Sequence, residues 1–254
     1  MLLACDIGNT NIKTGVFKDD EIVEFNSFSG YPSLINYLQK NKFKHAAISS
    51  VVPELTVKLK EDISSLFNID PFIINIFSSF KLKMNYDSIE TLGADRICSV
   101  EGSFELYKKS NEFKAFNPHT FLLSVDLGTA TTINIVKFPG EFIGGIIAPG
   151  INLMFESLNK KTAQLPEVDI LHYKSIIGKD TNSSIASGVI NSSIGLIERT
   201  IEFLKSNLQA ESFKIFITGG NAEKIIPYLK FNFEYVKGLV LIGINSIYKK
   251  NFPD

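Results

Sequence analysis

The sequence predicts an α/β protein made of two similar halves, each with a mixed sheet that has helices on both sides. In both halves, short strand-like runs come first and alternating helix and strand patterns follow. The segment 2–9 also aligns without gaps with 122–129, an offset of 120 residues that is close to half of the 254-residue chain. Both segments contain an Asp-x-Gly triplet that is flanked by strands and followed by a hairpin. Such a match at half the length of the chain is best explained by duplication. A hydrophobic content of 44% argues against a disordered chain.

The first half reads as three strands followed by helices and strands in alternation. Ile12, Thr14 and Val16 alternate on one face of the second strand, and Pro53 suits the first turn of a helix. The expected strands are 1–7, 11–17, 21–28, 45–51 and 72–76, and the expected helices are 32–41, 53–67 and 94–109.

A polar segment, 110–119, is the best candidate linker, and it divides the chain into domains 1–117 and 118–254. The second half repeats the three-strand opening, with strands after the alignment at 131–137 and 141–147. Apolar residues at steps of three to five predict a long helix at 182–208. The remaining expected elements are helices at 151–159, 221–229 and 239–249, a strand at 213–218, and an irregular segment to about 179.

Charge and cysteine content exclude several classes of protein. With 26 basic and 27 acidic residues, the net charge of -1 gives no general reason to bind nucleic acid or acidic membranes. No secretory signal or membrane-spanning stretch is present, so a cytoplasmic protein is expected. Cys5 and Cys98 lack metal-ligand spacing, which favours a buried apolar role. Arg96 and Arg199 are the chain's two arginines, against 24 lysines.

Two strand-to-strand turns carry an aspartate followed by glycine and small polar residues. In 6–11, the turn can offer backbone N–H groups and polar side chains to phosphate oxygens, while Asp6 can hold a hydrated Mg²⁺ and Lys13 can add a cation. An ordinary hairpin is the alternative, because aspartate, glycine and asparagine all favour turns. The second copy at 126–132 favours phosphate binding, since duplicated turns can face each other across a cleft.

A third motif, 215–222, is a strand that ends in Gly219 and Gly220 and opens a helix. Two glycines there let the backbone approach a flat ligand such as a purine, and a helix N-terminus favours anions. The sequence contains neither a P-loop nor a GxGxxG motif.

Together these turns resemble the actin, hexokinase and heat-shock-chaperone ATPase superfamily. Within it, the sequence is similar to the type III pantothenate kinase family over essentially the whole chain. Seven ordered motifs carry the resemblance: DIGNTNIK (6–13), LGADR (92–96), DLGTATT (126–132), GGIIAPGINLM (144–154), TAQLPEVD (162–169), GKDTNSSIASG (178–188) and TGGNA (218–222). One departure is Ile89, where the family usually has proline, although the spacing from Tyr86 to Gly93 is kept.

The resemblance implies two ribonuclease-H-like domains, each with a five-stranded mixed sheet, an ATP cleft between them, and a homodimer. It implies transfer of the ATP γ-phosphoryl group to pantothenate, which yields 4′-phosphopantothenate in the first step of coenzyme A biosynthesis. The implied cofactors are ATP, Mg²⁺ and a monovalent cation, K⁺ or NH₄⁺, which Asp126 would hold. The implied ATP-binding residues are Asp6, Ile7, Gly8, Asn9, Thr10, Asn11, Ile12, Lys13 and Thr129, and the implied substrate-binding residues are Tyr86, Gly93, Ala94, Asp95, Arg96 and Thr181.

The resemblance also implies that Asp95 is the catalytic residue, as the acceptor of the hydroxyl proton, and the chemistry of Asp95 and Arg96 agrees with the implied roles. A carboxylate can accept the proton of the attacking hydroxyl, and a guanidinium offers a donor fork that a lysine lacks. The alternatives are a first-turn carboxylate for Asp95 and a surface ion pair for Arg96. For Thr181 the alternative is a plain helix cap, and for Tyr86 it is loop packing.

Two other functions are compatible with the same motifs. One is a catalytically silent nucleotide-binding regulator, a transcription accessory protein of the same fold, although the chain has no basic DNA-reading element. The other is a kinase for a different small hydroxylated substrate.

Overall fold

The computed structural model describes residues 1–114 and 117–253. The chain divides into two compact units that do not follow the chain's halves. Unit 1 contains Met1–Phe116, Asn134–Gly144 and Gly238–Asp254, and unit 2 contains Asn117–Ile133 and Gly145–Lys237. The boundary predicted between residues 117 and 118 separates the two similar halves of the sequence, which differ from these units, and it stays a prediction.

The elements occur nearly where the sequence patterns place them. Up to residue 114 they are β1 (Leu2–Ile7), β2 (Ile12–Lys18), β3 (Glu21–Phe28), α1 (Tyr31–Gln39), β4 (His45–Ser50), α2 (Pro53–Phe67), β5 (Phe72–Ile73), β6 (Lys83–Met84), η1 (Ile89–Thr91), α3 (Ala94–Lys109) and α4 (Asn111–Lys114). From residue 117 they are β7 (Thr120–Leu127), β8 (Ala130–Lys137), β9 (Glu141–Pro149), α5 (Ile151–Lys161), η2 (Ile170–His172), α6 (Thr181–Leu208), β10 (Ser212–Thr218), α7 (Ala222–Ile225), η3 (Ile226–Tyr228), β11 (Glu234–Tyr235) and α8 (Leu239–Asn251).

Unit 1 is built on a five-stranded sheet in the order β3-β2-β1-β4-β5. The hairpin strands β1, β2 and β3 pair antiparallel, whereas β4 pairs parallel to β1 and β5 parallel to β4. Strand β1 is buried along its whole length because it has a strand on each edge and helices on both faces of the sheet. Its carboxyl end, at Asp6, is therefore a firmly held position in the middle of the sheet.

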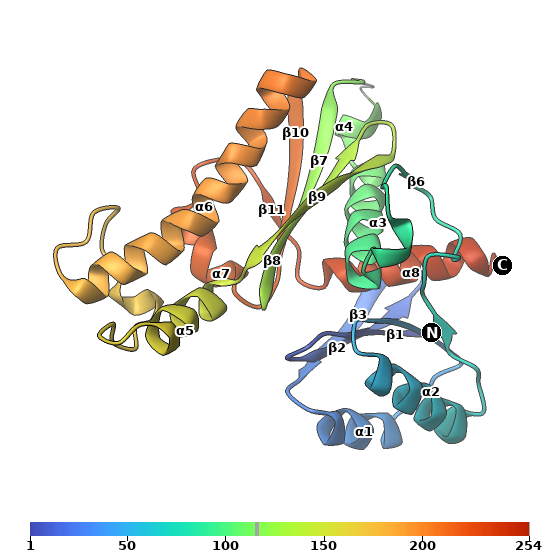
Figure 1. Cartoon of the computed structure of the whole chain (residues 1–254). Helices are drawn as coiled ribbons and strands as arrows, with labels where there is room; N and C mark the ends of the chain where they lie inside the picture. The colour runs from blue at the N-terminus through green and yellow to red at the C-terminus, as the bar shows by residue number, and fades with distance from the viewer. Residues whose placement is uncertain (115–116, 254) are drawn as a thin grey trace. The chain divides into compact units, whose positions relative to one another are not determined.

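Helices cover both faces of this sheet, as predicted (Figure 1). On one face, Leu3, Cys5 and Ile7 pack against Leu34 of α1 and Leu59 of α2. The other face carries α3 and α8. Alternate residues of β1 thus enter two different apolar layers, which explains why residues 2–5 are all apolar.

Helices α3 and α8 approach each other closely through two glycines. A Cβ on Gly102 or Gly243 would overlap backbone atoms of the opposite helix, at Leu239 and Cys98 respectively. Cys98 and Cys5 are fully buried free thiols, which confirms the predicted apolar role.

The second sheet has the order β11-β10-β7-β8-β9-β6. Its strands β9-β8-β7-β10-β11 repeat the order of the first sheet, in agreement with duplication. The sixth strand, β6, was not predicted: it comes from the first half and pairs in parallel with β9, where Lys83 N donates to Gly140 O (2.9 Å) and Asn85 N to Phe142 O (2.9 Å). Two residues are too few for a strand pattern, so only the tertiary contact defines β6.

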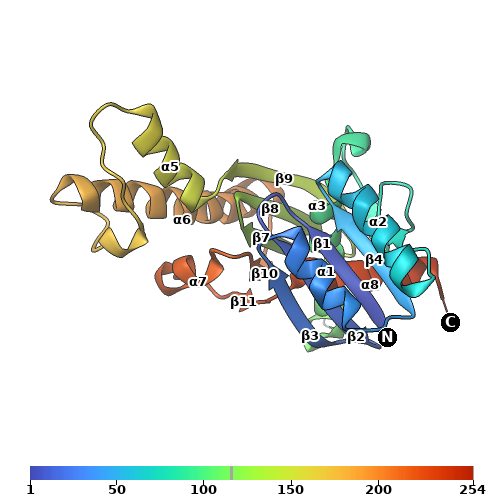
Figure 2. The ribbon, with the colours of Figure 1, turned by 90° about the horizontal axis from the view of Figure 1, so that it is seen from below.

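In unit 2, α5 and α6 lie side by side (Figures 1 and 2). The predicted helix 221–229 is interrupted, because Pro227 falls in η3 directly after α7. The predicted linker contains the short helix α4, and its residues 115–116 lie outside the described part of the chain. Within the described residues, no helix is both long and apolar enough to cross a membrane.

Candidate active site

The first Asp-Gly turn joins β1 to β2 in unit 1. Asp6 is only 8% exposed and lies opposite Lys13 in the register of β1 and β2. Gly8 N donates to Asn11 O (3.1 Å). The side chains of Asn9, Thr10 and Asn11 are exposed. The turn therefore presents amide and hydroxyl groups at its tip and holds a carboxylate at its base.

Two members of the predicted ATP-binding set face away from such a ligand site. Ile7 and Ile12 are 0% and 3% exposed and belong to the core against α1 and α2. Any contact that they make with a phosphate must come from their backbone. The polar side chains at this turn are those of Asp6, Asn9, Thr10, Asn11 and Lys13.

The second Asp-Gly turn joins β7 to β8 in unit 2. Three consecutive carbonyl groups at this turn accept hydrogen bonds: Asn221 N donates to Leu127 O (2.8 Å), Asn221 Nδ2 to Gly128 O (3.1 Å) and Gly150 N to Thr129 O (3.0 Å). Asp126 is half-buried and Thr129 is exposed. The turn is thus held by the segments that begin α5 and α7.

The double-glycine motif after β10 supports this second turn. Gly219 has φ +103, and a Cβ there would lie 2.5 Å from the Asp126 carboxylate and from the backbone of Leu127. Only glycine combines this conformation with so close an approach. The motif's visible role is to let β10 and its following turn pack against the Asp126 turn.

The LGADR segment forms the start of α3 in unit 1. Gly93 is the residue before the helix, and a Cβ on it would overlap Asp95 Oδ1. That oxygen accepts the neighbouring N–H of Arg96 (2.8 Å), whereas the other carboxylate oxygen has no partner among the described residues. Asp95 does lie in the first turn of the helix, as the alternative interpretation expected, but it does not cap it. Its second oxygen can accept a proton or a hydrogen bond.

Arg96 is buried, at 7% exposure. Its Nε donates to Asn134 Oδ1 (2.7 Å) and its Nη1 to the Tyr86 hydroxyl (3.3 Å), while Nη2 is buried without a partner among the described residues. The guanidinium also lies over the rings of Tyr86 and Phe142, 5.5 and 5.9 Å from their centroids. The surface ion pair considered for Arg96 is therefore wrong, since no carboxylate in the described chain pairs with it.

Tyr86 has both a packing role and a polar role. Its ring stacks on Phe142 with centroids 5.7 Å apart, and its hydroxyl accepts from Arg96. Asn134 and Phe142 were missed from the sequence. Asn134 interrupts the apolar run 133–136, and its burial at 0% makes that interruption the signal that could have revealed it.

Asp6 and Asp95 influence the same buried thiol. Burial raises the pKa of Cys98 well above its usual value, and the negative charges of Asp6 and Asp95 act in the same direction. The charges of both carboxylates of unit 1 therefore act on one residue of α3.

Thr181 is the first residue of α6 and is exposed. The cap of this helix is Asp180, which accepts from Ser183 N (2.8 Å) in a capping box. The interpretation of Thr181 as the cap is thus wrong by one residue. Thr181 lines a groove of about 1170 Å³ between α5 and α6.

Arg199 has a simpler explanation. It forms a solvent-exposed ion pair with Glu202 on α6 (Nη1 to Oε2, 2.8 Å). This confirms the surface contact considered for it.

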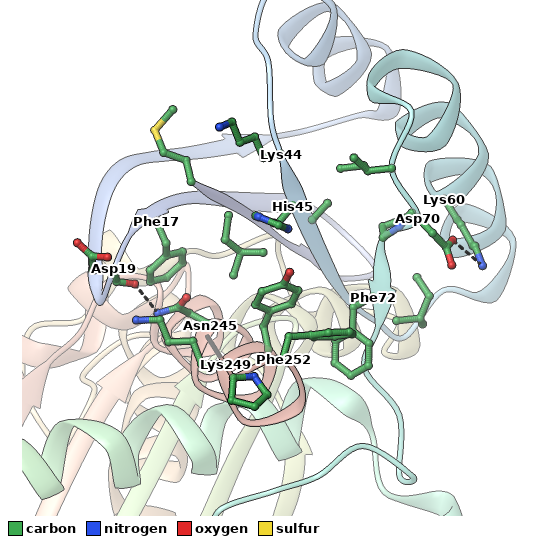
Figure 3. A pocket seen from close by; sticks show the side chains of 18 residues that line it. Phe17, Asp19, Lys44, His45, Lys60, Asp70, Phe72, Asn245, Lys249 and Phe252 are labelled. Atoms are coloured by element: carbon green, nitrogen blue, oxygen red, sulfur yellow. Dashed lines mark hydrogen bonds and ion pairs between the residues drawn. The ribbon is translucent and has the colours of Figure 1, made fainter.

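A second hollow, of about 1030 Å³, lies at the opposite end of the unit 1 sheet, beside the start of β1 and the end of α8 (Figure 3). His45, Phe72 and Phe252 contribute rings to it. Its Lys60 is paired with Asp70 (3.1 Å), and its Lys249 is paired with Asp20 (2.6 Å). None of the predicted site residues lines this hollow.

Similarity to known proteins decides the family. The family model for type III pantothenate kinase matches residues 2–202. The chain belongs to the type III pantothenate kinase family. It is 33% identical to the type III pantothenate kinase of Citrifermentans bemidjiense, across 99% of this chain and 100% of that protein. The type III pantothenate kinase of Agathobacter rectalis is also 33% identical, across 98% and 97% of the two chains. The predicted family and enzyme class are thereby confirmed.

Solved structures agree on the fold. A Campylobacter jejuni protein described as a Baf family transcriptional activator superposes with a TM-score of 0.61 at 22% identity, across 98% of both chains. The ROK hexokinase of Thermus thermophilus has a TM-score of 0.50 at 10% identity, across 98% of this chain and 99% of that one. At such identities the likeness concerns the fold alone, and it confirms the predicted fold class.

Proposed function

We propose that this member of the type III pantothenate kinase family transfers the γ-phosphoryl group of ATP to the terminal hydroxyl of pantothenate. The product is 4′-phosphopantothenate, in the first step of coenzyme A biosynthesis. The observation that carries this proposal is the start of α3, where Asp95 keeps one carboxylate oxygen without a partner among the described residues and the next residue, Arg96, is buried. The names of the relatives supply the substrate, and the site supplies suitable chemistry.

Asp95 is the proposed proton acceptor. Phosphoryl transfer needs the attacking hydroxyl to be positioned and the phosphate charge to be stabilised, and a carboxylate can do the first while accepting the proton. Because Oδ1 is held by Arg96 N, the other oxygen is the one that can face the hydroxyl.

Arg96 and Asn134 are proposed to bind polar groups of the substrate. Arg96 Nη2 and Asn134 Nδ2 are both buried donors without a partner among the described residues. A buried unpaired donor costs about 1–3 kcal/mol, so a ligand acceptor at this position would remove a penalty that the free protein carries. The other proposed substrate contacts are Tyr86, Gly93, Ala94 and Thr181.

The ATP phosphates are proposed to bind at residues 6–13 and Thr129. Exposed side chains at the first turn and the exposed Thr129 support this. The two aspartates are oxygen donors of the type that hard cations prefer. We propose Asp6 for a hydrated Mg²⁺ and Asp126 for K⁺ or NH₄⁺, which would supply positive charge near the phosphates. Among the described residues, no group of three or more His, Cys, Asp or Glu side chains could hold a metal ion.

We further propose a cytoplasmic homodimer. Exposed apolar residues support an interface on unit 2: Leu153 on α5 is 45% exposed, and Ile176 and Ile177 before α6 are 71% and 73% exposed. Such exposure is typical of a surface that another chain covers.

The test is a phosphorylation assay with ATP, Mg²⁺ and pantothenate, in K⁺ and then in Na⁺. Asp95→Asn should lower kcat by about 10²-fold or more while ATP still binds. Arg96→Lys should raise the KM for pantothenate, because an ammonium cannot reproduce the fork of donors. Ser103→Ala, on the same helix but bonded only to its own helix backbone, is the control.

The outcomes separate the alternatives. No phosphopantothenate in either salt contradicts the proposal, and specific DNA binding without kinase activity would favour the regulatory protein. Phosphorylation of another alcohol in a panel of acceptors would reassign the substrate and leave the ATP residues in place.

A further inference from the structure

A buried carboxylate on α3 holds the chain segment that leads to Tyr86. Oε1 of Glu101 accepts hydrogen bonds from two consecutive backbone N–H groups, those of Lys81 (2.7 Å) and Leu82 (2.9 Å). Glu101 is 0% exposed and lies in unit 1 together with the segment that it holds. The contact therefore joins two parts of the same unit that are about twenty residues apart in the chain.

An apolar side chain would suit this position better if packing were its only purpose. Desolvation raises the pKa of Glu101, and the two backbone N–H groups oppose this only in part. Oε2 is buried and has no partner among the described residues. A buried carboxylate with one unsatisfied oxygen is weak evidence for a stabilising role. The residue is better explained by what its other oxygen holds.

From Leu82 the chain runs directly to the proposed substrate residues. Lys83 and Met84 form β6, which lies near α3 (Figure 1) and pairs with Glu141 and Phe142 of β9. Two residues later, Tyr86 stacks on Phe142 and accepts from Arg96 Nη1.

Both ends of this segment are thus attached to α3. Glu101 holds its start, and Arg96, five residues earlier on the same helix, contacts its end. A second contact, from Lys81 Nζ to Glu105 Oε2 (2.6 Å), reinforces the start. The position of Tyr86 relative to Asp95 therefore depends on contacts that α3 makes at both ends of the segment.

We propose that Glu101 is a positioning residue for pantothenate. It fixes the start of the segment 81–86, so that Tyr86 and Arg96 meet the substrate in one arrangement. The inference rests on the proposed function, because it assigns Tyr86 to the substrate. It concerns a residue that contacts neither ATP nor pantothenate in the proposed scheme.

The experiment compares Glu101→Leu with Glu101→Gln. Glutamine keeps an oxygen that can accept both N–H groups, whereas leucine keeps the bulk and removes the acceptor. In Glu101→Leu we expect the KM for pantothenate to rise about tenfold and the KM for ATP to stay within about twofold of the native value. Glu101→Gln should restore most of the pantothenate KM, and Ser103→Ala, equally buried on α3, should change neither constant.

Hydrogen exchange provides a second readout that needs no activity. The amides of Lys81 and Leu82 should exchange at least about tenfold faster in Glu101→Leu than in Glu101→Gln, with no change in β1. If the native protein fails to phosphorylate pantothenate, the proposed function fails, and the exchange data still test the attachment.

Unchanged exchange and an unchanged pantothenate KM in Glu101→Leu would overturn the inference. So would equal rises in both KM values. If Glu101→Leu does not fold, Glu101→Met replaces it, and failure of both to fold would show that Glu101 acts on stability alone, which also overturns a positioning role.

Discussion

The two Asp-Gly turns derive from matching sequence segments but are built differently. In unit 1, four residues, 8–11, connect β1 to β2, whereas in unit 2 only Gly128 and Thr129 connect β7 to β8. The equivalent carbonyl groups keep an equivalent bond, from Val51 N to Ile7 O (3.1 Å) and from Asn221 N to Leu127 O (2.8 Å). The strand framework is thus common to both halves, and the turns differ.

The surroundings of the two turns differ as well. The second turn has further bonds to Gly128 O and Thr129 O, and Gly150 and Gly219 press against it. The first turn has exposed side chains at its tip, and a Cβ on Gly8 would meet only Asn11 O at 3.2 Å. The comparison teaches that the two halves share a strand framework, while one turn has exposed side chains at its tip and the other is held by hydrogen bonds from neighbouring segments.

The largest expected effect is a loss of stability at the second turn, 126–132. Gly219→Ala should lower the free energy of unfolding by about 3 kcal/mol or more, because it combines a left-handed φ with overlap of Asp126 and Leu127. Urea denaturation followed by circular dichroism measures this. Gly220→Ala is the matched control, since no atom lies within 4 Å of its Cβ position. Equal losses in both variants would show that the close approach of Gly219 is unimportant.

The next largest effect concerns the two carboxylates, and it depends on the proposed function. Asp6→Asn should lower kcat/KM for ATP about 100-fold in K⁺ and in Na⁺ alike, because the charge at the phosphate-binding turn is removed. Asp126→Asn should mainly abolish the difference between K⁺ and Na⁺. Steady-state kinetics in both salts distinguishes the variants, and identical salt responses would contradict separate roles for the turns.

A smaller loss of stability is expected when a glycine that packs against the second turn, Gly150, is compared with a glycine within the first turn, Gly8. Gly150→Ala should cost about 2 kcal/mol of stability, because its Cβ would overlap Gly128 O and lie 2.5 Å from Thr129 O. Gly8→Ala should cost less than about 1 kcal/mol, since its neighbour can shift by the few tenths of an ångström required. Thermal melts of both variants test the difference, and a larger loss at Gly8 would reverse our comparison.

The smallest expected loss of stability comes from a comparison of two asparagines, one at each turn. Asn221 is 7% exposed and its side chain bonds Gly128 O, so Asn221→Ala should lower stability by about 1 kcal/mol. Asn9→Ala, at the exposed tip of the first turn, should change stability by less than about 0.5 kcal/mol and instead raise the KM for ATP. A stability loss at Asn9 as large as that at Asn221 would show that the first turn is also a rigid element.

Local patterns predicted the elements well where the chain is long and regular. The helix expected at 94–109 is α3 without adjustment, and the helix expected at 182–208 is α6 with one residue added. Predictions were poorer where tertiary contacts define an element, as for β6 and β11, which have two residues each. The repeated opening segment predicted three neighbouring strands in each half, which are β1 to β3 and β7 to β9, whereas the matching places of β4 and β10 became visible only in the structure.

Part of the candidate site was also within reach of sequence reasoning. Asp95 and Arg96 were named from their chemistry and from a family motif that lies within a single helical turn. Asn134 and Phe142 were not, because each reaches the site from a segment far away in the chain. Glu101 was not, because its backbone partners lie about twenty residues before it. No local pattern reports which buried polar atom meets which distant partner.

The sequence by itself therefore determined the family, the strand and helix order, and the two aspartate turns, since these depend on residues close together in the chain. Tertiary structure alone decided that Arg96 is buried among Asn134, Tyr86 and Phe142. It also decided that one turn is backed by glycines and the other has an exposed tip. The physical reason is that burial and close approach are properties of segments that meet only after the sheets have formed.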